Sequence, residues 1–99
     1  MRRPSPFRTE QAAVDIGGNL AAWRKMLGLT VQQVAERAGT TRQTVARLEK
    51  GELSVGMGVF LDVCRALRVL DGVVESTDPY NTPFGRARAE QQLPKRVRR

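Results

Sequence analysis

The chain has 99 residues, enough for one domain with a modest core, and its 40% hydrophobic and 27% charged content is typical of a globular protein. It contains no histidine and a single cysteine, which removes the commonest general base, the commonest zinc ligand and any intramolecular disulfide. We therefore expect no enzyme activity, no metal site and no cofactor. No apolar stretch is long enough for a membrane span or a secretion signal, so we expect a cytoplasmic protein without membrane contact.

The formal charge of +7 favours a polyanionic partner, and most of it lies near the ends of the chain. Residues 1–14 hold three arginines and one acid, whereas residues 15–76 hold eight bases and seven acids. Residues 77–99 hold six bases and two acids. This distribution predicts a flexible arm over residues 1–13, a globular domain over residues 14–76 and a flexible basic tail over residues 77–99.

The first helix is predicted between an N-cap at Asp15 and a terminating glycine at Gly28. Gly17 and Gly18 are expected to weaken its first turn. Apolar residues recur along it at steps of three or four, the period of one helical face. The side chains expected to face the core are Ile16, Leu20, Trp23 and Leu27.

Two short helices are predicted next, joined by a tight turn. Thr30 is placed to cap the first of them, with Gln33 completing a capping box, and Thr41 is placed to cap the second. Gly39 between them is expected to adopt a positive φ, and Gly51 closes the pair. The residues expected to be buried are Val31, Val34, Ala35, Ala38, Val45 and Leu48.

The rest of the chain also shows helical patterns. A fourth helix is predicted over residues 57–67, a short fifth over residues 70–76, and a small helix from Pro83 to about Gln92. Turn-forming residues in the segment TDPYNTP mark a linker before this last helix. Because no strand pattern is found, the expected fold class is all-α.

The two central helices meet the steric demands of a helix-turn-helix. A small residue, a turn glycine and two aliphatic anchors are supplied by Ala35, Gly39, Val45 and Leu48. At these positions the chain resembles the lambda/434-repressor-like family, also called the XRE family. The segment GTTRQTVARLEKG at residues 39–51 is especially similar to the recognition segment of that family. The resemblance covers about residues 15–75 and implies a five-helix DNA-binding domain.

Members of that family bind double-stranded DNA as dimers, with the second motif helix in the major groove. The resemblance therefore implies a homodimer in which Arg42, Gln43 and Arg47 read bases. Arginine suits guanine and glutamine suits adenine. It also implies phosphate contacts by Gln32, Gln33, Thr41, Thr44 and Lys50. The alternative is that these polar side chains are only solvated.

Other features of the resemblance concern the structure of the domain. It implies an ion pair between Arg24 and Glu49, the alternative being two independent surface charges. It also places the dimer interface on the fifth predicted helix, at Leu70, Val73 and Val74.

The chain departs from the family pattern at three points. Val31 stands where the family usually has a glutamine, so one phosphate contact is expected to be missing or moved to Gln32. Thr40 replaces a usually apolar turn residue, and the loop before the fourth helix lacks the usual proline.

The segment TPFGRARAEQQLPKRVRR resembles the ending of small, HipB-like antitoxins, which are paired with HipA-like kinase toxins. The tail has four open interpretations: phosphate binding, minor-groove binding, docking on a partner protein, or disordered solubilising sequence. The preferred hypothesis is a sequence-specific repressor that binds a two-fold symmetric operator as a dimer and acts as an autoregulating antitoxin. The alternative is an interaction module that sequesters a toxin and binds DNA secondarily.

Overall fold

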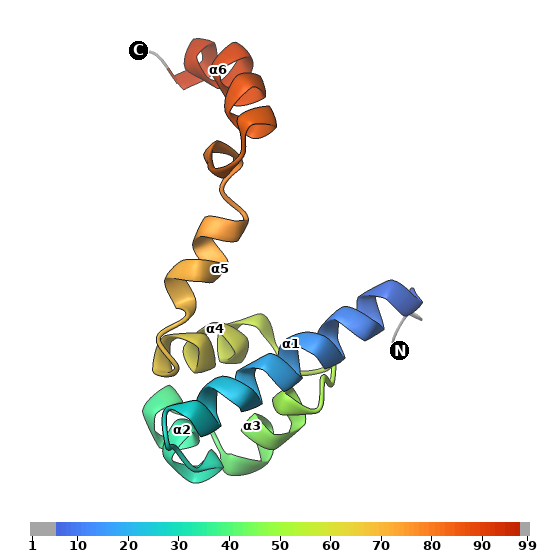
Figure 1. The fold of residues 1–99 in the computed structure, drawn as a ribbon, viewed down its shortest axis with the longest axis vertical. Coiled ribbons are helices and arrows are strands. Elements are labelled where there is room, and N and C mark those ends of the chain that lie inside the picture. Colours follow the sequence, from blue (N-terminus) through green and yellow to red (C-terminus); the bar gives the residue numbers. More distant parts are fainter. Residues whose placement is uncertain (1–5, 98–99) are drawn as a thin grey trace. The chain divides into compact units, whose positions relative to one another are not determined.

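The computed structural model describes residues 6–97, which form six α-helices and one short 3-10 helix, with no strand in that range (Figure 1). The expected all-α class is confirmed. The chain divides into two compact units between Val69 and Leu70, so the predicted domain end at residue 76 lies inside the second unit. No helix within the described residues is long and apolar enough to cross a membrane.

The first unit contains the four helices α1 (Phe7–Met26), α2 (Val31–Ala38), α3 (Arg42–Glu49) and α4 (Met57–Ala66). Helix α2 packs against α3 and α4, and α1 packs against α3 (Figure 1). Burial of apolar side chains from all four helices supplies the driving force for this packing. The core residues are Leu20, Val34, Ala35, Ala38, Val45, Leu48, Val63, Cys64 and Leu67.

Helix α1 begins much earlier than the sequence predicted. Its N-cap is Pro6, so the N-cap prediction at Asp15 was wrong, and residues 7–13 of the predicted flexible arm are helical. This segment is rich in good helix formers, and its C-terminal end lies against the chain at Gly51. The backbone of Val14 lies so close to Gly51 that a Cβ on that glycine would be 2.6 Å from the Val14 Cα. Residues 1–5 of the predicted arm lie outside the described residues.

The buried face of α1 also differs from the prediction. Leu20 is only 4% exposed, but the other three residues expected in the core are each more than 40% exposed: Ile16, Trp23 and Leu27. Gly17 is buried instead, because α1 approaches α3 through this position. A Cβ on Gly17 would lie 2.5 Å from the carbonyl oxygen of Leu48. The glycine therefore permits a close helix contact, a role that apolar periodicity does not reveal.

The ends of α2 and α3 agree with the predicted caps. The Thr30 hydroxyl accepts a hydrogen bond from the Gln33 amide at 3.0 Å, and the Gln33 side chain accepts one from the Thr30 amide at 2.9 Å. Gly39 ends α2 with a φ of 76°. The Thr41 hydroxyl accepts a hydrogen bond from the Thr44 amide at 3.2 Å and thereby starts α3. These caps fix where each motif helix begins.

The second unit contains α5 (Leu70–Ser76), the 3-10 helix η1 (Pro79–Asn81) and α6 (Pro83–Val97). Helix α6 begins at the predicted residue, where the Thr82 hydroxyl accepts a hydrogen bond from the Gly85 amide at 2.9 Å. The Arg86 Nη1 donates to the Tyr80 carbonyl at 2.9 Å, and Ala89 is buried.

The expected flexibility of the C-terminal tail is not confirmed in the part that the structure describes. Besides the contacts just given, Gly85 packs directly on the carbonyl of Pro79, so η1 and α6 form one folded element. Helix α6 also continues beyond the predicted end near Gln92. The last two residues of the basic segment KRVRR lie outside the described residues.

Candidate nucleic-acid interface

The turn between α2 and α3 sets the position of α3. After Gly39, the Thr40 amide donates a hydrogen bond to the Ala35 carbonyl at 2.9 Å, which closes the end of α2. Ala35 and Val45 are fully buried where the two helices meet. A small residue in α2 therefore allows close contact with α3, as the helix-turn-helix pattern predicted. Because the inner face of α3 is buried, its opposite face is left for contacts outside the domain.

Arg42 and Gln43 occupy the first turn of α3 and are both exposed, as expected for residues that contact a ligand. They follow the Thr41 cap directly, so the capped start of the helix fixes their backbone. The helix dipole adds partial positive charge at this end. The first turn thus offers guanidinium and amide donors on a rigid scaffold.

The side chain of Arg47, the third predicted base reader, is partly exposed and makes hydrogen bonds to two other side chains of the protein. Its Nε donates to the Oε1 of Glu52 at 2.9 Å, and its Nη2 donates to the Ser54 hydroxyl at 2.7 Å. Sequence reasoning missed Glu52 and Ser54. The sequence signal was Gly51, a residue type that favours a tight turn; its φ is 84°, and the Glu52 amide that follows donates to the Arg47 carbonyl at 3.1 Å.

Four of the five residues predicted to contact phosphate make hydrogen bonds within the protein, and the fifth, Lys50, is exposed. Gln33 belongs to the capping box, and Gln32 donates to Glu36 at 3.1 Å. The hydroxyls of Thr41 and Thr44 lie 2.9 Å apart and share a hydrogen bond. Lys50 is exposed after the end of α3. Engagement leaves each glutamine and threonine with further hydrogen-bonding capacity, so a phosphate role for them stays a prediction.

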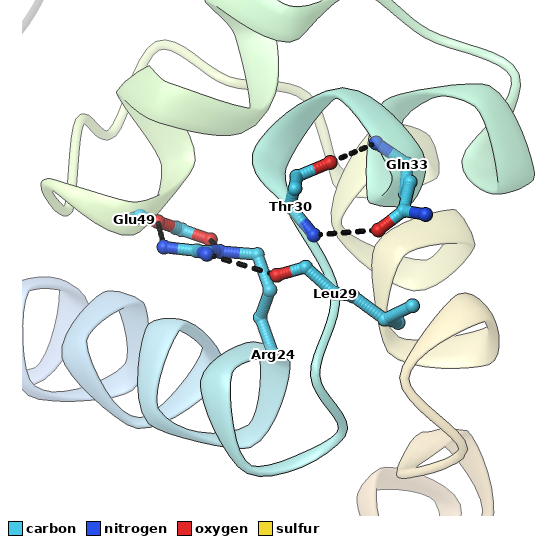
Figure 2. Close-up of polar contacts among 5 residues, drawn as sticks. All are labelled: Arg24, Leu29, Thr30, Gln33 and Glu49. Carbon is cyan, nitrogen blue, oxygen red and sulfur yellow. Dashed lines mark hydrogen bonds and ion pairs between the residues drawn. The ribbon is translucent and has the colours of Figure 1, made fainter.

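Arg24 and Glu49 lie together, as the resemblance implied. The Arg24 Nε and Nη2 donate to the two carboxylate oxygens of Glu49 at 2.7 and 3.2 Å, and Nη1 donates to the Leu29 carbonyl at 3.1 Å (Figure 2). Both side chains are only 13% exposed. The hydrogen bond with Glu49 raises the pKa of Arg24, against the lowering effect of burial. The pair joins α1 to the end of α3 and so helps to fix the orientation of α3.

The predicted dimer residues all lie on α5 in the second unit. Leu70 and Val73 are half-buried there, whereas Val74 is 59% exposed. A homodimer through this helix stays a prediction.

The described residues also include carboxylates that could act as metal ligands and one cysteine, Cys64. Within residues 6–97, no three His, Cys, Asp or Glu residues come together in a way that could hold a metal ion. Cys64 is fully buried among the core residues of α4, and this burial raises the pKa of its thiol. The cysteine therefore acts as a small apolar core residue in this structure.

Comparison with known proteins gives the family. Over 44 residues the chain is 50% identical to an uncharacterized HTH-type transcriptional regulator of Methanothermobacter thermautotrophicus, an alignment that covers 44% of this chain and 64% of the relative. The chain thus spans somewhat less than two thirds of that relative. No solved structure matches. Residues 15–76 match the family described as "Helix-turn-helix domain", which covers α2, α3 and more than half of the chain. This protein therefore belongs to the helix-turn-helix domain family.

Proposed function

We propose that the protein is a sequence-specific, DNA-binding transcriptional regulator of the lambda/434-repressor-like (XRE) type. The observation that carries this proposal is that α3 has one buried apolar face and one exposed polar face. Its inner residues Val45 and Leu48 are buried, while Arg42 and Gln43 are exposed in its first turn. The relative named as a transcriptional regulator supports the same assignment.

The exposed side chains match the chemistry of a DNA major groove. The Arg42 guanidinium can donate two hydrogen bonds to O6 and N7 of guanine, and the Gln43 amide can donate to and accept from adenine. The N-termini of α2 and α3, capped by Thr30 and Thr41, carry partial positive charge that favours nearby phosphates. In this proposal the base readers are on α3, and the phosphate contacts surround its N-terminus.

The proposed regulator acts as a homodimer and repressor on a two-fold symmetric operator. Half-sites about 34 Å apart would match two copies of α3 related by a two-fold axis. The exposed Val74 and half-buried Leu70 and Val73 of α5 supply the apolar surface for the dimer. In this assignment, symmetry of the bound DNA follows from symmetry of the protein.

The proposed biological setting is a toxin–antitoxin pair, in which the protein represses its own operon and binds a HipA-like kinase toxin. The folded η1–α6 element supports a docking role. Phe84 is 71% exposed, and the Arg88 guanidinium lies 5.3 Å from the centre of its ring. An exposed aromatic residue beside an arginine is typical of protein interfaces. The same observation favours a second candidate function, a toxin-sequestering module for which DNA binding is secondary.

Selection of bound sequences from a random DNA pool tests the proposal. We expect a two-fold symmetric consensus. Arg42→Ala should then cost about 1–3 kcal/mol on that sequence and relax the preference at one base pair in each half-site. Arg65→Ala, which removes an exposed arginine from α4, is the matched control and should leave the preferences unchanged. Equal loss on consensus and random DNA would make Arg42 a phosphate contact, and the absence of any enriched sequence would overturn the proposal.

Deletion of residues 77–99 separates the two candidate functions. If the tail binds phosphates, its removal should flatten the dependence of DNA affinity on salt concentration. An unchanged salt dependence, together with loss of binding to a HipA-like kinase toxin, would favour the toxin-docking role.

A further inference from the structure

The loop after α3 contacts one side of Arg47 through Glu52 and Ser54, and we call these two residues the Arg47 bracket. Gly51 turns the chain with a φ of 84°, and the Glu52 amide then donates to the Arg47 carbonyl at 3.1 Å. The Glu52 carboxylate accepts from the Arg47 Nε at 2.9 Å, and the Ser54 hydroxyl accepts from its Nη2 at 2.7 Å. Glu52 is thus bound to Arg47 by both its backbone and its side chain, which gives the guanidinium a defined orientation.

The atoms used by the bracket leave part of the guanidinium available. A guanidinium has five N–H donors in a fixed plane. Glu52 and Ser54 occupy the side edge of Arg47, which is formed by Nε and one N–H of Nη2. The adjacent edge, at the end of the guanidinium, has one N–H of Nη1 and the second N–H of Nη2. Two parallel donors on one edge match O6 and N7 of guanine.

Stability of the domain does not explain the bracket. The Arg47 and Glu52 side chains are 44% and 46% exposed, and ion pairs at such positions contribute little to folding. A carboxylate beside a DNA-reading arginine also repels phosphates and partly cancels its charge. That arrangement lowers affinity for DNA of any sequence. It is useful where an arginine must read a base and must not simply bind the backbone.

We propose that Glu52 and Ser54 are positioning residues that hold Arg47 as a guanine reader, and that Glu52 also weakens binding to non-cognate DNA. This inference rests on the proposed function and adds to it two specificity residues that lie outside α3. Orientation of a side chain by a neighbouring acid reduces the conformational freedom lost on binding. The restrained arginine then discriminates between bases more sharply than a mobile one.

The test uses the full chain and the consensus obtained by selection. Arg47→Ala first identifies the base pair whose guanine preference is lost. At this base pair, we expect Glu52→Gln and Ser54→Ala each to reduce the preference for guanine over adenine by about three- to tenfold. Glu52→Gln should also raise affinity for a random duplex and steepen its salt dependence by about one counterion. Preferences at the other base pairs should not change.

The matched control is Asp62→Asn, which removes one exposed acid from a similar pair with Arg65 on α4. Thermal melting of each variant checks that the domain is folded. The inference is overturned if Arg47→Ala relaxes no base pair, if Glu52→Gln leaves the guanine preference intact, or if Asp62→Asn has the same effects. A uniform loss at every base pair would also overturn it, because that result indicates a displaced α3. A wild-type protein that enriches no sequence would overturn the proposed function itself.

Discussion

Two arginine–glutamate pairs flank the end of α3, and they differ mainly in burial. The inner pair, Arg24 with Glu49, joins two helices, and each of its side chains is 13% exposed. The outer pair, Arg47 with Glu52, is 44% and 46% exposed and lies within one short segment. Water screens the outer pair and solvates either partner if the other is removed, whereas the inner pair has mainly protein around it. The same two functional groups therefore fix a helix in one place and orient a surface side chain in the other.

The largest effect is expected from breaking the inner pair. Glu49→Ala leaves the Arg24 guanidinium poorly solvated and without its carboxylate, so the free energy of unfolding should fall by about 3 kcal/mol. Urea denaturation followed by circular dichroism measures this change. Glu52→Ala is the matched control, with an expected loss below about 1 kcal/mol. Equal losses in the two variants would contradict the distinction between the pairs.

A second substitution tests the helix contact beside the inner pair. A methyl group at Gly17 would lie 2.5 Å from the Leu48 carbonyl oxygen and 2.7 Å from that of Glu49, so α1 and α3 must move apart. We expect Gly17→Ala to lower the free energy of unfolding by about 1–3 kcal/mol.

The control is Gly18→Ala on the same helix, because a Cβ there meets no atom within 4 Å. Because alanine has a higher helix propensity than glycine, Gly18→Ala should stabilise the domain by up to about 1 kcal/mol. Stabilisation by both substitutions, measured in the same denaturation experiment, would show that α1 and α3 do not need the close contact.

The sequence predicted those parts of the motif that depend on local chemistry. Thr30, Gln33, Gly39 and Thr41 are recognisable because capping and positive φ favour particular residue types at fixed offsets. The Arg24–Glu49 contact is different, since no local spacing connects residues so far apart in the chain. Only the resemblance to a known family indicated it.

The predictions from sequence were wrong or incomplete where tertiary contacts determine which residues are buried and which side chains meet. Apolar periodicity placed Trp23 in the core, but α1 turns Gly17 toward α3, and Trp23 is 44% exposed as a result. Periodicity counts apolar side chains and cannot recognise a contact that requires no side chain. The bracket around Arg47 was missed for a related reason. It depends on the path of the loop through Glu52 and Ser54, which residue spacing does not define.

The pH dependence of stability should differ between the buried thiol of Cys64 and the inner ion pair, because the thiol loses its proton at a lower pH than Arg24. Burial raises the pKa of Cys64, so the folded protein keeps the thiol proton at a pH where the unfolded chain releases it. The thiol's contribution to stability is present below its unfolded pKa, near 8.5, and is lost progressively above it. Burial is outweighed for Arg24 by the hydrogen bond with Glu49, which raises the pKa of its guanidinium, so the contribution of Arg24 persists to a much higher pH than that of the thiol.

We therefore expect the free energy of unfolding to fall between pH 8 and 10, and Cys64→Ala to reduce this fall although it also lowers stability at pH 7. Urea denaturation across this pH range measures both effects. If Cys64→Ala leaves the pH dependence unchanged, the thiol is not its source. Loss of the inner pair between these pH values would contradict the persistence of the Arg24 charge.

The smallest effect concerns the outer pair itself. A double-mutant cycle with Arg47→Ala and Glu52→Gln should give a coupling in unfolding free energy of about 0.2–1 kcal/mol. The coupling should shrink at 1 M salt, where the Debye length is about 3 Å. A coupling near 3 kcal/mol that resists salt would mean that this pair holds the fold. Any effect of Glu52 on DNA recognition would then follow from a displaced α3, and the orientation of Arg47 would no longer be needed to explain it.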